Sequence, residues 1–303
     1  DDVAGFTIVE SSGSTSVDES GTTDTFTVVL DSQPLSNVVL SISSSDSGEA
    51  TTTSLLTFTS ANWDTAQTVT VTGVDDDIID GSVSSTLTIA IVDAISDDSF
   101  DAVADQTVSV TTTDDDVAGF TIVESSGSTS VDESGTTDTF TVVLDAEPDS
   151  DVVLSVTSGD TGEATVTSSL TFTSANWDTA QTVTVTGADD DLVDGTITST
   201  ITVSVNDGSS DNNFDSASDQ TVSVATTDDD VAGFTIAETD SSTSVSESGT
   251  TDTFTIVLNA QPSSDVALSV TSGDAGESIS NSPLTFTSAN WDTAQTVTVT
   301  GVD

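Results

Sequence analysis

The amino-acid sequence predicts an all-β protein of tandem antiparallel β-sandwiches that form a rod. The first observation is an internal repeat. The segment Asp114-Asp115-Asp116-Val117-Ala118-Gly119-Phe120 returns 114 residues later, at 228–234, and the chain opens on a shortened copy of it. The second observation is that short stretches alternating apolar and hydroxylated residues recur at the same places in each copy. A period of this length is the size of a whole domain rather than of a solenoid rung.

The repeat predicts three domains, named here unit 1 (1–116), unit 2 (117–230) and unit 3 (231–303, incomplete). Only the Asp triplet separates the last strand of one unit from the next unit, so we expect a stiff junction rather than a flexible linker. Unit 3 stops before the counterparts of the strands at Leu87 and Val108. We therefore expect that the native chain continues, or that another subunit supplies the missing strands.

Seven strands are expected in unit 1, each apolar on one face and hydroxylated on the other. They are predicted at residues 6–9, 25–30, 38–43, 56–59, 68–72, 87–91 and 107–111. Turn signals such as Glu19-Ser20-Gly21 and Asp80-Gly81 separate them. Seven short strands with frequent turns are typical of a β-sandwich. Its expected core contains Phe6, Phe26, Phe58 and Phe100.

The charge of the chain is entirely negative. Its 303 residues include 53 Asp and Glu and no Lys, Arg or His, which gives a formal net charge of −53. This excludes ordinary nucleic-acid binding, which needs cations against phosphate, and disfavours anionic membrane surfaces. No apolar run approaches the roughly 18 residues of a transmembrane helix. Because no basic side chain exists, the carboxylates can be neutralised only by water, salt or bound metal.

Four acidic clusters lie at predicted strand ends in unit 1 and recur in unit 2. They are Glu19, the pair Asp46 and Glu49, the run 75–80, and the triplet 114–116. Alternate strand ends of a sandwich meet at one pole, so several clusters can meet there and repel one another. A hard divalent cation would relieve the repulsion, and ligands without His or Cys select Ca²⁺. The alternative is a solvated acidic surface that keeps the protein soluble.

Two better-known calcium motifs are absent. Read as an EF-hand loop, residues 76–87 have Asp and Gly at the fifth and sixth places. Their third and twelfth places are Ile78 and Leu87, which lack ligand side chains. The glycine-rich nonapeptide of parallel β-helices does not occur. A calcium site would therefore be of another kind.

The order of these motifs resembles the Calx-beta domain. The stretch Val17-Asp18-Glu19-Ser20-Gly21, the run 75–80 and the terminal triplet 114–116 follow the family pattern, and residues 56–73 are similar to its bacterial branch. The resemblance implies an immunoglobulin-like sandwich that binds Ca²⁺ at one pole. Asp80 stands where the exchanger members have Glu, and Gly81 stands where they have a further acid.

The resemblance also implies a ligand set. In unit 1 it comprises Glu19, Asp75, Asp76, Asp77, the backbone carbonyl of Ile78, Asp80, Asp114, Asp115 and Asp116. In unit 2 it comprises Glu133, Asp189, Asp190, Asp191, Leu192, Asp194, Asp228, Asp229 and Asp230, and in unit 3 Glu247 and Asp303.

These observations favour a structural, extracellular, calcium-binding array: the stalk of a bacterial surface adhesin or the shaft of a matrix fibre. Its expected partners are neighbouring repeats and other copies of itself in a fibre, with a possible glycan or cell-surface partner elsewhere in the full chain. The alternative is a glycan-, ice- or cell-binding module that uses outer faces, with Trp63 or the row Thr68, Thr70 and Thr72 as contacts. A carboxylate-pair glycosidase is disfavoured, because acids at the same place in every unit suit a scaffold.

Overall fold

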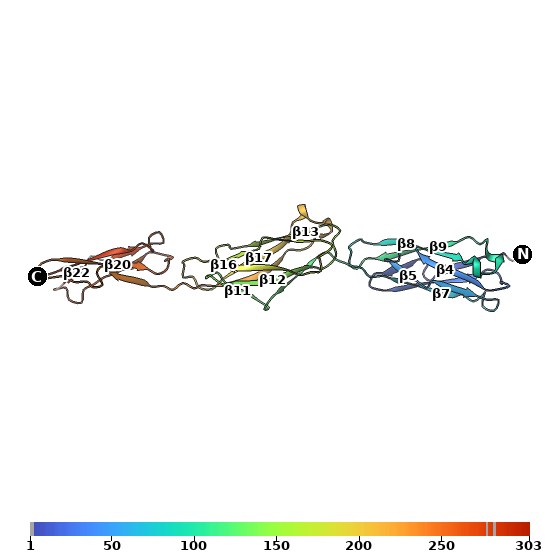
Figure 1. The fold of residues 1–303 in the computed structure, drawn as a ribbon, viewed down its shortest axis with the longest axis horizontal. Helices are drawn as coiled ribbons and strands as arrows, with labels where there is room; N and C mark the ends of the chain where they lie inside the picture. The colour runs from blue at the N-terminus through green and yellow to red at the C-terminus, as the bar shows by residue number, and fades with distance from the viewer. Residues whose placement is uncertain (1–2, 277, 281–282) are drawn as a thin grey trace.

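The protein is a rod of β-sandwiches. A computed structural model describes residues 3–276, 278–280 and 283–303. Units 1, 2 and 3 lie end to end along the long axis, with the two chain ends at opposite ends of the rod (Figure 1). The alternating apolar residues dictate this architecture, since each sheet can bury its apolar face only against a second sheet.

Unit 1 is a sandwich of two sheets. The first has the order β1 (Phe6–Glu10), β3 (Thr23–Leu30), β7 (Gln67–Gly73), β5 (Ala50–Thr52). The second has the order β2 (Thr15–Asp18), β9 (Gln106–Thr113), β8 (Val83–Ile91), β4 (Val38–Ser44), β6 (Leu55–Phe58). Two short 3-10 helices, η1 (Asp93–Ile95) and η2 (Asp98–Phe100), connect β8 to β9.

Unit 2 repeats this topology. Its first sheet is β10 (Phe120–Glu124), β12 (Thr137–Leu144), β16 (Gln181–Gly187), β14 (Ala164–Val166). Its second is β11 (Thr129–Asp132), β18 (Gln220–Thr227), β17 (Ile197–Val205), β13 (Val152–Ser158), β15 (Ser169–Phe172). The 3-10 helices η3 (Asp207–Ser209) and η4 (Asn212–Phe214) precede β18.

Unit 3 keeps the first sheet and only part of the second. The first contains β19 (Phe234–Glu238), β20 (Thr251–Leu258), β24 (Gln295–Gly301) and β22 (Ser278–Ser280), in that order. The second contains β21 (Val266–Leu268) and β23 (Leu284–Phe286). None of the helices in the described part of the chain is long and apolar enough to cross a membrane.

Units 1 and 2 each contain two short strands beyond the seven predicted. In unit 1 these are β2 and β5, which span four and three residues and are too short to show a clear alternation. β2 pairs with β9 in parallel, from Thr15 opposite Val110 to Asp18 opposite Thr113. The second sheet is therefore mixed, although its other strand pairs are antiparallel. The parallel pair places the ends of β2 and β9 side by side at one pole.

The sandwich core of unit 1 contains the expected aromatic residues. Phe26 and Phe58 are fully buried, and Phe100 and Phe6 are 1% and 3% exposed. Trp63 is half-buried, packs against this core, and its carbonyl accepts a hydrogen bond from the Leu30 N–H at 3.1 Å. This favours the interpretation of Trp63 as a core anchor over that of a sugar-stacking platform.

Consecutive units touch through the loop that carries the acidic run. The Glu147 N–H of unit 2 donates to the Asp77 carbonyl of unit 1 at 2.7 Å, and Ile78 forms a parallel bridge with Glu147. The Ile79 side chain packs against the core of unit 2. The next junction repeats the backbone bond, from the Gln261 N–H to the Asp191 carbonyl at 2.6 Å.

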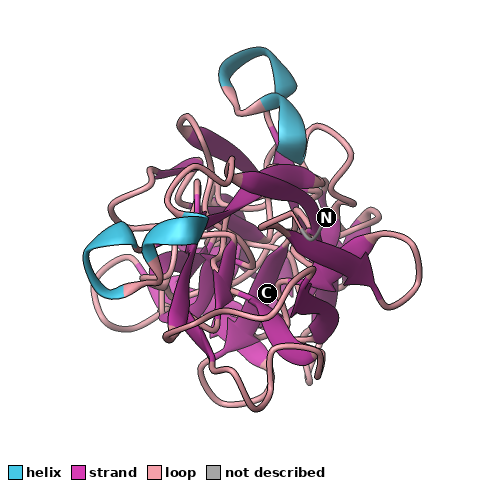
Figure 2. Ribbon diagram, turned by 90° about the vertical axis from the view of Figure 1, so that its right-hand side faces the viewer, coloured by secondary structure: helices cyan, strands magenta, loops and turns pink. Residues whose placement is uncertain are grey.

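The units are also turned about the rod axis. Figure 2 looks along the rod, and the 3-10 helices of units 1 and 2 lie at two different places around its periphery. Because these helices occupy equivalent positions in the two units, unit 2 is rotated relative to unit 1. The hydroxylated outer faces of consecutive units therefore point in different directions.

Candidate metal centre

Glu19 is placed at the pole by the strand that precedes it. β2 ends at Asp18, and the Glu19 N–H continues the parallel ladder by donating to the Thr113 carbonyl at 3.1 Å. Gly73, at the end of β7, lies so close to the Asp18 backbone that a Cβ atom there would overlap it. The glycine thus lets β7 pass next to Glu19, so the acidic run after β7 begins beside this side chain.

Hydrogen bonds hold the acidic run against the Asp triplet. The Asp76 carboxylate accepts from the Ile78 N–H at 2.9 Å, which closes a turn within the run. Gly81 has a φ of 74°, a conformation that favours glycine, and its N–H donates to the Asp114 carboxylate at 2.7 Å. The other oxygen of Asp114 accepts from the Asp116 N–H at 2.7 Å. Loop and triplet therefore form one structure.

Two groups of carboxylates converge in unit 1. Glu19, Asp76 and Asp116 form one, and Glu19, Glu49 and Asp80 form the other; in each, one oxygen per residue lies within 4.8 Å of the others. Glu19 belongs to both and is 1% exposed. Both of its carboxylate oxygens, and one each of Glu49 and Asp116, are buried without a hydrogen-bond partner. Such oxygens are costly unless something compensates their charge.

The pKa values reflect this crowding. Burial, followed by the negative charges of Asp114 and Asp76, raises the pKa of Glu19 to about 7. Burial, followed by the charge of Asp114, raises the pKa of Asp116 to about 6. Burial and the charges around them raise the pKa values of Glu49 and Asp80 as well. Without a cation, part of this cluster is protonated near neutral pH.

Unit 2 builds an equivalent centre: five of its six converging residues occupy the positions of the unit 1 residues, and the sixth, Asp228, corresponds to Asp114. Its groups are Glu133 with Asp228 and Asp230, and Glu163 with Asp190 and Asp194. Burial raises the pKa of Glu133 to about 7, with the charges of Asp190 and Asp228 next in size. Both Glu133 oxygens are buried and lack a hydrogen-bond partner, as are single oxygens of Glu163 and Asp230. The repeat thus reproduces the buried acidic pole in both complete units.

The structure brings together part of the sequence-predicted ligand set. Glu19, Asp76, Asp80, Asp116, Glu133, Asp190, Asp194, Asp228 and Asp230 belong to the converging groups. Asp114 lies close enough to Glu19 to raise its pKa. Ligation by any of these residues remains a prediction.

Other members of the predicted set lie outside the groups. The side chains of Asp75, Asp77, Asp115, Asp189, Asp191, Asp229, Glu247 and Asp303 are exposed, and those of Ile78 and Leu192 are half-buried. The Ile78 carbonyl accepts from the Asp80 N–H at 3.0 Å. In the described part of unit 3, no three acidic side chains converge.

Sequence reasoning did not include Glu49 and Glu163 among the ligands. Glu49 is 6% exposed and lies just before β5, and its carbonyl accepts hydrogen bonds from the Val74 N–H at 3.0 Å and the Thr112 hydroxyl at 3.3 Å. These bonds bring the side chain beside the acidic run. The sequence feature that could have identified them as ligands is the recurrence of the Asp46 and Glu49 pair at the same place in unit 2. The fold of β5 against β7 was needed to place it at the pole.

The donor set fits a hard divalent cation. Every converging side chain is a carboxylate, and neither His nor Cys occurs in the chain. Oxygen ligands of this kind suit Ca²⁺, which accepts six to eight oxygens in flexible geometry, better than Zn²⁺ or Cu²⁺. The unpartnered oxygens of Glu19 and Glu133 are free to bind it.

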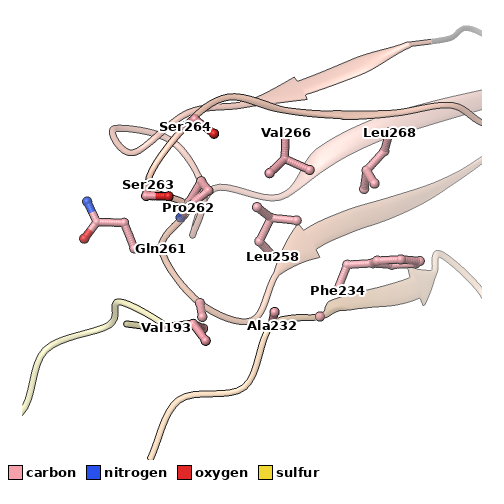
Figure 3. A pocket seen from close by; sticks show the side chains of 12 residues that line it. Val193, Ala232, Phe234, Leu258, Gln261, Pro262, Ser263, Ser264, Val266 and Leu268 are labelled. Carbon is pink, nitrogen blue, oxygen red and sulfur yellow. The ribbon is translucent and has the colours of Figure 1, made fainter. Parts of the chain in front are cut away.

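An apolar recess on unit 3 is a different kind of site. It is lined by Phe234, Leu258, Val266 and Leu268, with Val193 of unit 2 at its edge (Figure 3). No acidic side chain lines it. It is the open interior of the unit 3 sandwich rather than a cation site.

Comparisons with protein-family models and with curated proteins give no match to the sequence. Among solved structures, the calcium binding domain CBD12 of CALX1.1 is similar at 14% identity, over 65% of this chain and 80% of that one, with a TM-score of 0.29. Surface layer protein SbsC, domains 4-9, is similar at 16% identity, over 92% of this chain and 38% of that one, with a TM-score of 0.31. An endo-fucoidan hydrolase of glycoside hydrolase family 107 is similar at 13% identity, over 72% of this chain and 27% of that one, with a TM-score of 0.25.

The predicted likeness to the Calx-beta domain thus has a counterpart among solved structures. Because the TM-scores are low, the assignment of tandem β-sandwiches rests on the strand pairing of the chain itself.

Proposed function

We propose that this chain is a structural calcium-binding array whose units are stiffened by Ca²⁺ at one pole of each complete sandwich. The observation that carries the proposal is the burial of Glu19 and Glu133, whose four carboxylate oxygens have no hydrogen-bond partner and face further carboxylates. A chain without a single basic side chain cannot compensate these charges internally. A bound divalent cation would.

The residues at the pole join segments that are distant in sequence. Glu19 follows β2, Asp76 and Asp80 lie in the loop after β7, and Asp116 follows β9. Held together, they fasten both sheets of the sandwich and the exit of the chain toward the next unit. Calcium would supply the positive charge that allows these carboxylates to remain ionised at this distance.

We further propose that the array acts outside the cell, as the stalk of a bacterial surface adhesin or the shaft of a fibre such as a biofilm matrix fibre. Extracellular calcium sites typically have Kd values of about 10⁻⁴ to 10⁻³ M, which millimolar calcium would fill. The repeated acidic poles support this location, because they would be filled where calcium is abundant. Neighbouring units, and other copies of the chain in a fibre, are the proposed partners.

Calorimetric calcium titration of the whole chain tests the proposal. Glu19→Gln should abolish or strongly weaken binding in unit 1, and Glu133→Gln should do the same in unit 2, because each removes a charge shared by the pole. Glu247→Gln is the matched control, since this exposed residue occupies the equivalent position in unit 3. If the unsubstituted chain takes up no calcium, or if all three variants bind it equally, the acidic poles are solvated surfaces.

A further inference from the structure

Unit 2 reaches back to unit 1 through one side chain that sequence analysis did not single out. The Asn213 side-chain amide, on η4, donates to the Ile79 carbonyl of unit 1 at 3.1 Å. The supporting loop is firmly held: the buried carboxylate of Asp211 accepts from the Asn213 N–H at 2.9 Å and from the Ser150 N–H at 2.8 Å. The amide therefore extends from a fixed platform.

This contact differs in position from the others at the junction. The covalent connection runs through the triplet 114–116, and the bond between Glu147 and Asp77 joins the two units a second time. The Ile79 side chain also packs against the core of unit 2. Glu147 lies in the loop between β12 and β13. Asn213 binds the same 77–79 loop from η4, a different element of unit 2. A loop held from two elements of the neighbouring unit resists rotation of that unit more than a loop held from one.

We propose that Asn213 sets the rotation of unit 2 relative to unit 1, by recognising the backbone of the preceding unit's loop at Ile79. Unit 1 has Ser99 at the equivalent position, and its hydroxyl donates to Asp97 within its own loop at 2.6 Å. Ser99 thus stabilises its own loop, whereas the longer side chain of Asn213 reaches the neighbouring unit. The partner surface is the 77–79 segment of another unit of this same chain. The inference concerns the junction and does not depend on calcium occupying either pole.

Distance measurement between two spin labels tests the inference in the whole chain. The chain contains no cysteine, so Thr68→Cys and Thr182→Cys provide unique labelling sites at equivalent exposed positions on the outer faces of units 1 and 2. Because both labels lie off the rod axis, their separation changes when one unit turns. The unsubstituted junction should give one narrow distance distribution in saturating calcium.

Asn213→Ser introduces the residue that unit 1 carries at this position and should abolish the single narrow distribution. Asn213→Asp keeps the side-chain size, removes the amide donor, and should do the same. Asn212→Ser, at the exposed neighbouring residue, is the matched control and should leave the distribution narrow. Calcium uptake and melting temperature should be unchanged in all three, which separates this inference from the proposed function. A narrow, unshifted distribution in both Asn213 variants would overturn it.

Discussion

Phe120 and Phe234 begin the same strand in units 2 and 3 and are surrounded by nearly the same sequence, yet they are 2% and 52% exposed. Their strand pairing is also the same, with Phe120 opposite Leu144 and Phe234 opposite Leu258. The difference is the second sheet: among the described residues of 231–303, no strand is equivalent to β17 or β18. The first sheet therefore forms from its own segments, whereas its burial depends on the other sheet.

The segment after the first strand shows the same dependence more sharply. Residues 129–132 form β11 by parallel pairing with β18, whereas the similar residues 243–246 form no strand in the described part of unit 3. The acid that follows is affected too, since Glu133 is 1% exposed and Glu247 is exposed. The comparison teaches that the β18-type strand creates both the parallel pair and the buried acidic pole.

The largest expected effect comes from truncating the phenylalanine that begins the first strand in unit 2 or in unit 3. Phe120→Ala should destabilise unit 2 by about 3–5 kcal/mol, as is usual for a buried Phe. Phe234→Ala should cost unit 3 far less, because half of that side chain is exposed. Each unit has one tryptophan: Trp63, Trp177 or Trp291. When the other two are replaced by Phe, the fluorescence of the remaining tryptophan reports the thermal unfolding of its own unit. Equal losses in units 2 and 3 would contradict the role assigned to the second sheet.

Calcium removal should destabilise units 1 and 2 but leave the stability of unit 3 unchanged. A site filled at ~100-fold excess over its Kd adds roughly 2.7 kcal/mol to the free energy of unfolding. Chelation should therefore lower the melting temperatures reported by Trp63 and Trp177 and leave that of Trp291 unchanged. The measurement is fluorescence-detected melting at constant ionic strength. A shift of equal size at Trp291 would show a general ionic effect rather than binding at the acidic poles.

A smaller effect is expected from the loop that closes the second sheet. Asp97 is 5% exposed, and its carboxylate accepts from the Ser99 hydroxyl at 2.6 Å and the Ser36 N–H at 2.7 Å. These bonds hold the pKa of Asp97 well below its usual range, the Ser99 hydroxyl most strongly. Asp97→Asn should cost unit 1 about 1–3 kcal/mol. Asp98→Asn, on the exposed neighbour, should change the Trp63 melt little; equal effects would refute the role of the buried carboxylate.

A pH dependence confined to units 1 and 2 is expected in chelator. The pKa values of Glu19 and Glu133 are raised from 4.5 to about 7. Between these values Glu19 and Glu133 bind more protons in the folded units than in the unfolded chain, so the contribution of these two groups to stability is greatest below pH 4.5 and is lost as pH rises through 7. Saturating calcium should suppress this fall by replacing the protons. If the double variant Glu19→Gln, Glu133→Gln keeps the full dependence, other groups cause it.

The sequence predicted most of this architecture because the alternation of Val, Leu and Phe with Thr is strong in the long strands. It did not predict β2 and β5, since strands of three or four residues exist only through their pairing with β9 and β7. For the metal centre, the repeat identified the acidic clusters, but only the fold could separate buried Glu49 from exposed Asp75. Asn213 was invisible to sequence reasoning, because its partner is the backbone carbonyl of another unit.

The parallel pairing of β2 with β9 determines how tension would pass through a unit. A pull along the rod enters near β1 at one end and leaves through β9 at the other, so it draws β2 and β9 past each other. The four register pairs between Thr15–Asp18 and their partners in β9 are then loaded together in shear, not one after another as in unzipping. Glu19 and Asp114 directly follow these two strands. A cation held at their ends would clamp the sheet where the load is greatest.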